Sequence, residues 1–186
     1  MDQFTLNQED TILLIIDVQD RLTPAIYDQA SIISRTIVLL QAAAEMNMPV
    51  LLTEQYPRGL GATVTAIREL LAEHLPDAQN FEKLTFSACT PEFNAALAAT
   101  GRKKVIIAGM ETHVCVFQTT RQLLADGYQV FIARDAVSSR TQENRENGLQ
   151  LMSAMGAIIS NTETILLDLQ KVAGTPQFKQ ISKLIK

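Results

Sequence analysis

The position of Cys115 in the sequence is one at which a cysteine can act as a nucleophile. Cys115 follows an apolar run at residues 105–108, a glycine and a short polar turn, and it lies near the start of a predicted helix. Unpaired backbone N–H groups and the positive end of the helix dipole favour the thiolate, which is the attacking form of cysteine. The sequence therefore predicts a reactive thiol at position 115 whose sulfur is held as an anion.

Asp17 and Lys83 both lie at the carboxyl ends of predicted strands. Asp17 closes the apolar run 11–16, and Lys83 ends a short predicted strand near residues 78–83. Because ligands bind beyond the carboxyl ends of parallel strands, we predict that both side chains converge on Cys115. Taken alone, Asp17 also fits a turn cap and Lys83 a solvated strand end. Cys89 precedes a helix start without such partners, and we interpret it as structural.

The elements that must position these residues follow a regular order. Short apolar runs typical of strands covered on both faces alternate with segments of helical spacing. The runs are residues 11–17, 49–53, 104–108, 129–133 and 157–160, with the short strand near 78–83 as a sixth. Such alternation predicts an α/β fold, a Rossmann-like three-layer sandwich with a six-stranded, mostly parallel sheet and helices on both faces. We expect one domain over residues 1–186.

Composition narrows the function classes. The chain has 186 residues, 47% hydrophobic and 19% charged, as in ordinary globular proteins. Its net charge of -4 argues against a nucleic-acid partner. No apolar run approaches the ~18 residues of a membrane span, and the first residues do not resemble a signal peptide. We therefore expect a cytoplasmic protein with no membrane or nucleic-acid partner.

Several separated motifs together resemble one known family. They are Ile15-Ile16-Asp17-Val18-Gln19, Lys83 followed by Thr85-Phe86-Ser87, and Gly109-Met110-Glu111-Thr112-His113-Val114-Cys115-Val116, with Thr53-Glu54-Gln55-Tyr56-Pro57-Arg58-Gly59-Leu60-Gly61, Ser138-Ser139-Arg140 and Pro176-Gln177-Phe178-Lys179. On these residues the chain resembles the isochorismatase-like cysteine hydrolases, and within them the isochorismatase-domain-containing proteins. The similarity extends over essentially the whole chain.

The resemblance implies a catalytic triad of Asp17, Lys83 and Cys115. Asp17 would take the thiol proton with help from the field of Lys83, and the thiolate would form a covalent intermediate that water cleaves. The backbone N–H groups of Glu111 and Cys115 would form the oxyanion hole. The family pattern also implies a cis peptide bond between Met110 and Glu111.

The sequence differs from those of nicotinamidases and true isochorismatases in two ways that bear on the predicted substrate. Nicotinamidases of this fold bind a metal through an aspartate and histidines after the second strand, whereas this chain has Glu54-Gln55-Tyr56-Pro57 there and only two histidines, His74 and His113. We therefore expect neither a metal nor a cofactor. True isochorismatases lack the nucleophilic cysteine, so Cys115 favours a small amide-like or imide-like substrate over a vinyl ether.

Other predictions concern the pocket, the partners and the alternative function. The residues proposed to contact substrate are Gln19, Glu54, Tyr56, Phe86 and His113. These positions also fit a subunit contact, and for His113 a wall or supporting role is favoured because it points away from Cys115 on a helix. We expect a homo-oligomer, dimer or tetramer. The amphipathic segment 176–185 fits packing on its own sheet or on a partner. The alternative function is a binding protein with a vestigial pocket.

Overall fold

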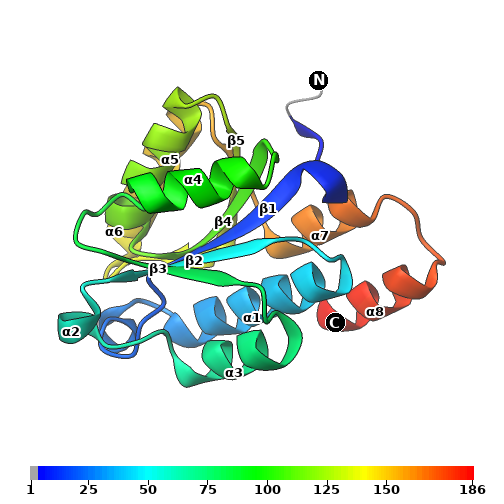
Figure 1. Cartoon of the computed structure of the whole chain (residues 1–186), viewed down its shortest axis with the longest axis horizontal. Coiled ribbons are helices and arrows are strands. Elements are labelled where there is room, and N and C mark those ends of the chain that lie inside the picture. The colour runs from blue at the N-terminus through cyan, green and yellow to red at the C-terminus, as the bar shows by residue number, and fades with distance from the viewer. Residues whose placement is uncertain (1–3) are drawn as a thin grey trace.

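The computed structural model describes residues 4–186, and its centre is a six-stranded sheet in which every pair of neighbours is parallel. The strands are β1 (Thr11–Ile16), β2 (Val50–Gln55), β3 (Gln79–Lys83), β4 (Lys104–Met110), β5 (Gln129–Ser138) and β6 (Ile158–Ser160). Their order across the sheet is β3-β2-β1-β4-β5-β6 (Figure 1). The predicted α/β fold is confirmed.

Helices connect the strands as the apolar spacing predicts. The α-helices are α1 (Gln29–Glu45), α2 (Pro57–Leu60), α3 (Thr65–His74), α4 (Pro91–Ala99), α5 (Phe117–Ala125), α6 (Gln142–Ala154), α7 (Thr162–Gln170) and α8 (Pro176–Leu184). Two 3₁₀ turns, η2 (Gln8–Asp10) and η3 (Thr23–Ala25), and a π-helical turn, η4 (Thr112–Val116), complete the order. Side-chain caps start several helices, among them Thr90 on α4 and Thr141 on α6.

Two apolar cores lie on the two faces of the sheet. One packs α1, α3, α7 and α8 against the sheet, and the other packs α4, α5 and α6 against the opposite face (Figure 1). β1 and β4 are buried along their whole length, which explains why their sequences are continuous apolar runs rather than alternating ones. β3 is an edge strand and is mostly exposed, so its apolar signal in the sequence is weak.

The order of strands reverses between β1 and β4. From β1 the chain builds outward to β2 and β3, and from β4 it builds outward to β5 and β6. Ile16 pairs with Gly109 at this junction, and a side chain on Gly109 would stand 2.0 Å from the Ile16 carbonyl oxygen. Only glycine lets the two strands meet there. Asp17 directly follows β1, and η4 follows β4 across one residue, so the predicted site lies at the switch point.

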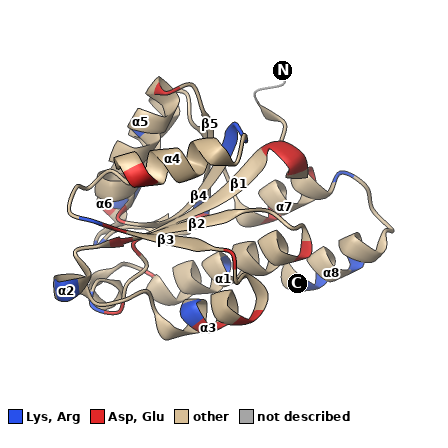
Figure 2. Ribbon diagram, viewed as in Figure 1, with Lys and Arg blue, Asp and Glu red and all other residues tan. Residues whose placement is uncertain are grey.

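The amphipathic C-terminal segment packs on its own chain. α8 contacts α1 and α7, and Ile181 is fully buried in the core that α1 shares. No helix in residues 4–186 is long and apolar enough to cross a membrane. Figure 2 shows acidic and basic residues on helices of both layers, with neither sign confined to one of them.

Candidate active site

Asp17 and Lys83 meet in a fully buried ion pair. Lys83 Nζ lies 2.7 Å from Asp17 Oδ2, and neither side chain has exposed surface. The other carboxylate oxygen, Oδ1, accepts a hydrogen bond of 2.7 Å from the Thr53 hydroxyl at the end of β2. Asp17 has φ 53°, a left-handed conformation that aspartate tolerates better than most residues. The turn after β1 is therefore shaped around this carboxylate.

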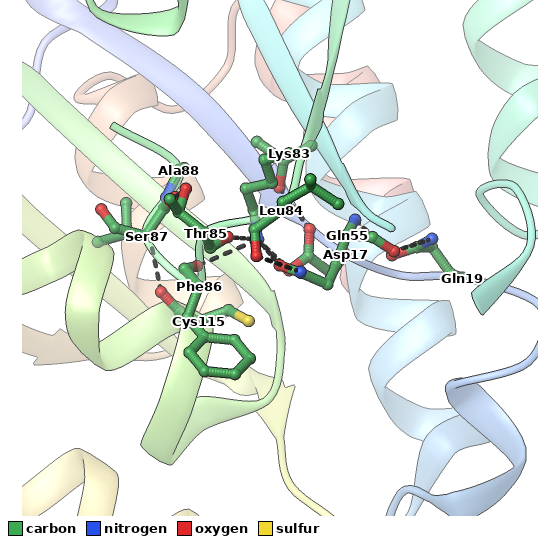
Figure 3. A network of polar contacts seen from close by, with 12 residues as sticks. Asp17, Gln19, Gln55, Lys83, Leu84, Thr85, Phe86, Ser87, Ala88 and Cys115 are labelled. Atoms are coloured by element: carbon green, nitrogen blue, oxygen red, sulfur yellow. Dashed lines mark hydrogen bonds and ion pairs between the residues drawn. The ribbon is translucent and has the colours of Figure 1, made fainter. Parts of the chain in front are cut away.

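The Lys83 ammonium also holds the loop that follows β3. It donates to Gln55 Oε1 at 2.8 Å and to the carbonyl oxygens of Thr85 and Phe86 at 3.3 and 3.1 Å. Gln55 in turn donates from Nε2 to the carbonyl oxygen of Leu84 at 2.9 Å. Figure 3 shows these groups around the ammonium. A lysine with this many acceptors is held in one place and does not behave as the solvated strand end that the sequence also allowed.

Cys115 lies in the π-helical turn η4 that leads into α5, 6% exposed. Burial and then the negative charge of Asp17 together raise the pKa of its thiol to about 12, against the opposing positive charge of Lys83. The Asp17 carboxylate and the Glu111 backbone N–H are both near enough to the sulfur to act on this pKa, the first raising it and the second lowering it. The structure thus contradicts the prediction of a resting thiolate, because desolvation and the carboxylate outweigh the helix dipole and the ammonium.

Glu111 is fixed by an ion pair on the other side of the sulfur. Its carboxylate accepts from the backbone N–H of Arg140 at 2.9 Å and from Arg140 Nε and Nη2 at 3.1 and 2.7 Å. Burial by itself would raise the pKa of this carboxyl, but the hydrogen bonds and the charge of Arg140 lower it below its usual value. The Met110–Glu111 peptide bond is cis in the structure.

Three of the five predicted pocket residues lie at the surface around this site. Tyr56 is half exposed and, with Pro57, Arg58, Glu82, Lys83 and Leu84, lines a cavity of about 360 Å³. Phe86 is also half exposed, on the loop whose carbonyl oxygens bind Lys83. His113 Nδ1 lies 2.9 Å from Ser139 Oγ, which fits the supporting role predicted for it.

The other two predicted pocket residues bind neighbouring loops. Gln19 is fully buried and exchanges hydrogen bonds with the Gln55 backbone, donating also to the Gly61 carbonyl oxygen at 2.6 Å. Glu54 is 7% exposed, and its Oε1 accepts from the backbone N–H and the hydroxyl of Thr63 at 2.6 and 2.7 Å. Gln19 is thus held by the end of β2 and by the loop that precedes α3, and Glu54 by that loop.

Four residues near the triad had no assigned role in the sequence: Thr53, Gln55, Thr119 and Arg140. Thr119 alone left a local signal, because a threonine four residues after Cys115 shares its helix face and can bond its carbonyl oxygen. The others act across long sequence distances. Among the side chains of residues 4–186, no cluster of three His, Cys, Asp or Glu has an arrangement that could hold a metal ion.

Comparisons with known proteins match this architecture over nearly the whole chain. The isochorismatase domain family matches residues 11–164. The secreted isochorismatase effector Isc1 of Phytophthora sojae is 40% identical over 178 residues, which cover 95% of this chain and 84% of that protein. Isochorismatase domain-containing protein 1 of Danio rerio is 39% identical over 182 residues. They cover 97% of this chain but only 62% of that protein, so this chain spans less than two thirds of its length.

Two solved structures have the same fold. The MAR1 ribonuclease of Caenorhabditis elegans superposes with a TM-score of 0.91 at 37% identity, covering 97% of this chain and 92% of that one. YcaC of Pseudomonas aeruginosa, solved with hexane-2,5-diol and covalent acrylamide, gives 0.88 at 25% identity, covering 97% and 91%. The family match and the relatives lead to one conclusion: this chain belongs to the isochorismatase family, in the group of isochorismatase domain-containing proteins.

Proposed function

We propose that this protein is a cysteine hydrolase that works without a metal on a small amide-like or imide-like molecule. The observation that carries the proposal is the carboxylate of Asp17, which binds the buried Lys83 ammonium at 2.7 Å and lies near enough to the Cys115 thiol to raise its pKa. A thiol beside a fixed base is the arrangement that nucleophilic catalysis requires. The relative YcaC, solved with covalent acrylamide, supports the presence of a nucleophile that reacts with small electrophiles in this fold, because acrylamide alkylates nucleophiles through its carbon–carbon double bond.

The first half of the reaction forms a thioester. The sulfur of Cys115 attacks the substrate carbonyl carbon while its proton passes to Asp17, and the carbonyl oxygen becomes an oxyanion. The backbone N–H groups of Glu111 and Cys115 stabilise that oxyanion. The carbon–nitrogen bond then breaks, and the leaving nitrogen takes the proton from Asp17. Because the resting thiol has a pKa of about 12, proton transfer must accompany attack.

The second half of the reaction hydrolyses the thioester and regenerates the free Cys115 thiol. Water gives a proton to Asp17 and its oxygen attacks the thioester carbon; the carbon–sulfur bond breaks, and the sulfur recovers the proton. Lys83 stays charged throughout and stabilises the carboxylate form of Asp17. Its four oxygen partners, Asp17, Gln55, Thr85 and Phe86, hold it in place for that role.

A substrate screen tests the proposal. Small amides, imides and vinyl ethers are offered to the wild type, Cys115→Ala and Cys89→Ala, with RNA included because one relative is named a ribonuclease. We expect turnover of an amide or imide by the wild type and by Cys89→Ala, and none by Cys115→Ala. Turnover that survives in Cys115→Ala contradicts the proposal. No turnover of any compound supports the alternative, a binding protein on the same fold.

We also propose that copies of this chain associate as a dimer or tetramer. Leu84, Phe86 and Tyr56 are 78%, 53% and 49% exposed around the mouth of the site, and apolar side chains grouped in this way are typical of subunit contacts. Light scattering on the purified protein measures the mass directly. A monomer across the micromolar range contradicts this proposal.

A further inference from the structure

We propose that Thr119 is a positioning residue, which sets the loop 84–88 against the nucleophile and so fixes the distance between the Cys115 sulfur and its activating groups. The inference rests on the proposed function, since it names a residue that supports the same site. Thr119 lies on α5, one helical turn after Cys115, and it is fully buried.

The hydroxyl of Thr119 makes two hydrogen bonds in opposite directions. It donates to the carbonyl oxygen of Cys115 at 2.7 Å and accepts from the backbone N–H of Ala88 at 2.9 Å. Ala88 is fully buried and lies 31 residues earlier in the chain. A hydroxyl that bonds the carbonyl oxygen four residues earlier is common in helices. The second bond is not local, and it ties the nucleophile's own peptide group to the end of the loop.

The start of the same loop is held by Lys83. Its ammonium binds the carbonyl oxygens of Thr85 and Phe86, and it binds Asp17. The contacts therefore form a continuous series from the Cys115 peptide group through Thr119, the loop and Lys83 to Asp17, which acts on the thiol by its charge. Figure 3 shows Cys115, the loop, Lys83 and Asp17 in this series. The position of the ammonium thus depends on the position of the loop. Two side-chain hydrogen bonds join the loop to α5, one from the backbone N–H of Ala88 to Thr119 and one from Ser87 Oγ to Gln122 Oε1 at 3.2 Å. Of the two, only the Thr119 hydroxyl also bonds the peptide group of Cys115.

The next residue along the helix supplies a matched control. Thr120 is also fully buried, but in the part of the chain that the structure describes its hydroxyl has no hydrogen-bond partner. Replacing Thr119 or Thr120 by valine removes one hydroxyl in each case and leaves the side-chain volume nearly unchanged. Of the two changes, only the one at position 119 breaks the series of contacts from Cys115 to the loop.

The test measures the alkylation of Cys115 by iodoacetamide near neutral pH. In this step a sulfur–carbon bond forms, the carbon–iodine bond breaks, iodide leaves with the electron pair, and the thiol proton passes to Asp17. Trypsin places Cys89 and Cys115 on separate peptides, residues 84–102 and 105–121, so mass spectrometry follows each thiol by itself. Unfolding in urea, measured in parallel, reports the folded fraction of every variant.

We expect Thr119→Val to slow alkylation of Cys115 by on the order of tenfold to a hundredfold, the cost of a small misplacement in a catalytic constellation. Thr119→Ser keeps the hydroxyl and restores the wild-type rate, and Thr120→Val leaves the rate unchanged. Cys89 reacts alike in all variants. If Thr119→Val does not fold, Thr119→Ala takes its place, and a rate equal to that of Thr119→Ser overturns the inference.

The outcomes separate this inference from the function on which it rests. If Cys115 in the wild type reacts no faster than Cys89, the proposed nucleophile is wrong, and the Thr119 inference fails with it. If Cys115 in the wild type reacts faster than Cys89 and Thr119→Val reacts as fast as the wild type, the nucleophile stands and only the positioning role is overturned. Equal slowing in Thr119→Val and Thr120→Val also overturns it, because the effect then belongs to helix packing.

Discussion

Lys83 Nζ lies 2.7 Å from Asp17 Oδ2 with both side chains removed from solvent. Burying two charges is costly, and a well-packed apolar pair is often as stable, so the fold does not need this ion pair for its stability. The hydrogen bonds from Thr53 to Asp17 and from Lys83 to Gln55 satisfy the remaining polar atoms. The pair therefore fits the proposal that Asp17 acts as the base for the Cys115 thiol, because a structural role alone does not account for it.

Replacing only one residue of the Asp17–Lys83 pair should lower the free energy of unfolding more than replacing both together. Asp17→Asn and Lys83→Met each leave a buried group without its partner, and each should lower the free energy of unfolding by about 3–5 kcal/mol. The double variant should lose much less than the sum. Urea unfolding of the four proteins measures the coupling. Additive losses would contradict a buried pair.

The alkylation of Cys115 should depend weakly on pH. Burial raises the pKa of both thiols, to about 12 for Cys115 and about 11 for Cys89, so preformed thiolate would give Cys115 no advantage over Cys89. If Asp17 takes the proton during attack, Cys115 reacts faster near neutrality and its rate stays flat where the Cys89 rate climbs about tenfold per pH unit. Asp17→Asn should restore the climb at Cys115. A steep wild-type profile would rule out Asp17 as the base.

Arg140 should stabilise the fold at neutral pH and lose that effect in acid. The pKa of Glu111 is lowered in the folded protein, so the folded state binds fewer protons than the unfolded state. The contribution is present above the usual carboxyl pKa and disappears as pH falls through the lowered value. Arg140→Met should therefore lower the free energy of unfolding at about pH 7 more than at about pH 3.

A control for that measurement is Arg58→Met, which changes the net charge equally at an exposed position on α2. It should shift stability little at either pH, because surface charges contribute little. Equal effects of the two substitutions at both pH values would show that net charge, rather than the contact with Glu111, is responsible.

Gly148 should tolerate no side chain, although it stands inside a helix. A Cβ there would lie 2.9 Å from the backbone nitrogen of His113 and from the carbonyl group of Thr112, so α6 would have to move away from η4. Alanine normally improves a helix, but here overpacking should lower the free energy of unfolding by about 1–3 kcal/mol. Ser153→Ala on the exposed side of α6 is the control. Thermal unfolding measures both, and a stabilised Gly148→Ala would contradict the close packing.

The sequence by itself determined the α/β fold, because buried parallel strands must be continuous apolar runs and their connections must be helices. The apolar runs at β1 and β4 are such cases. The strand β3 was visible only as a weak segment, since an edge strand buries little. The C-terminal extension of β5 to Ser138 carried no such signal, because it pairs with β4 across a register shift.

The positions of Asp17, Lys83 and Cys115 at strand ends also followed from the sequence, because parallel strands bring their carboxyl ends to one edge. The state of the sulfur did not. It depends on the balance of burial, one carboxylate and one ammonium, and only the tertiary structure sets the distances that decide this balance. The same holds for Thr119 and Arg140, whose partners Ala88 and Glu111 are remote along the chain and meet them only after folding.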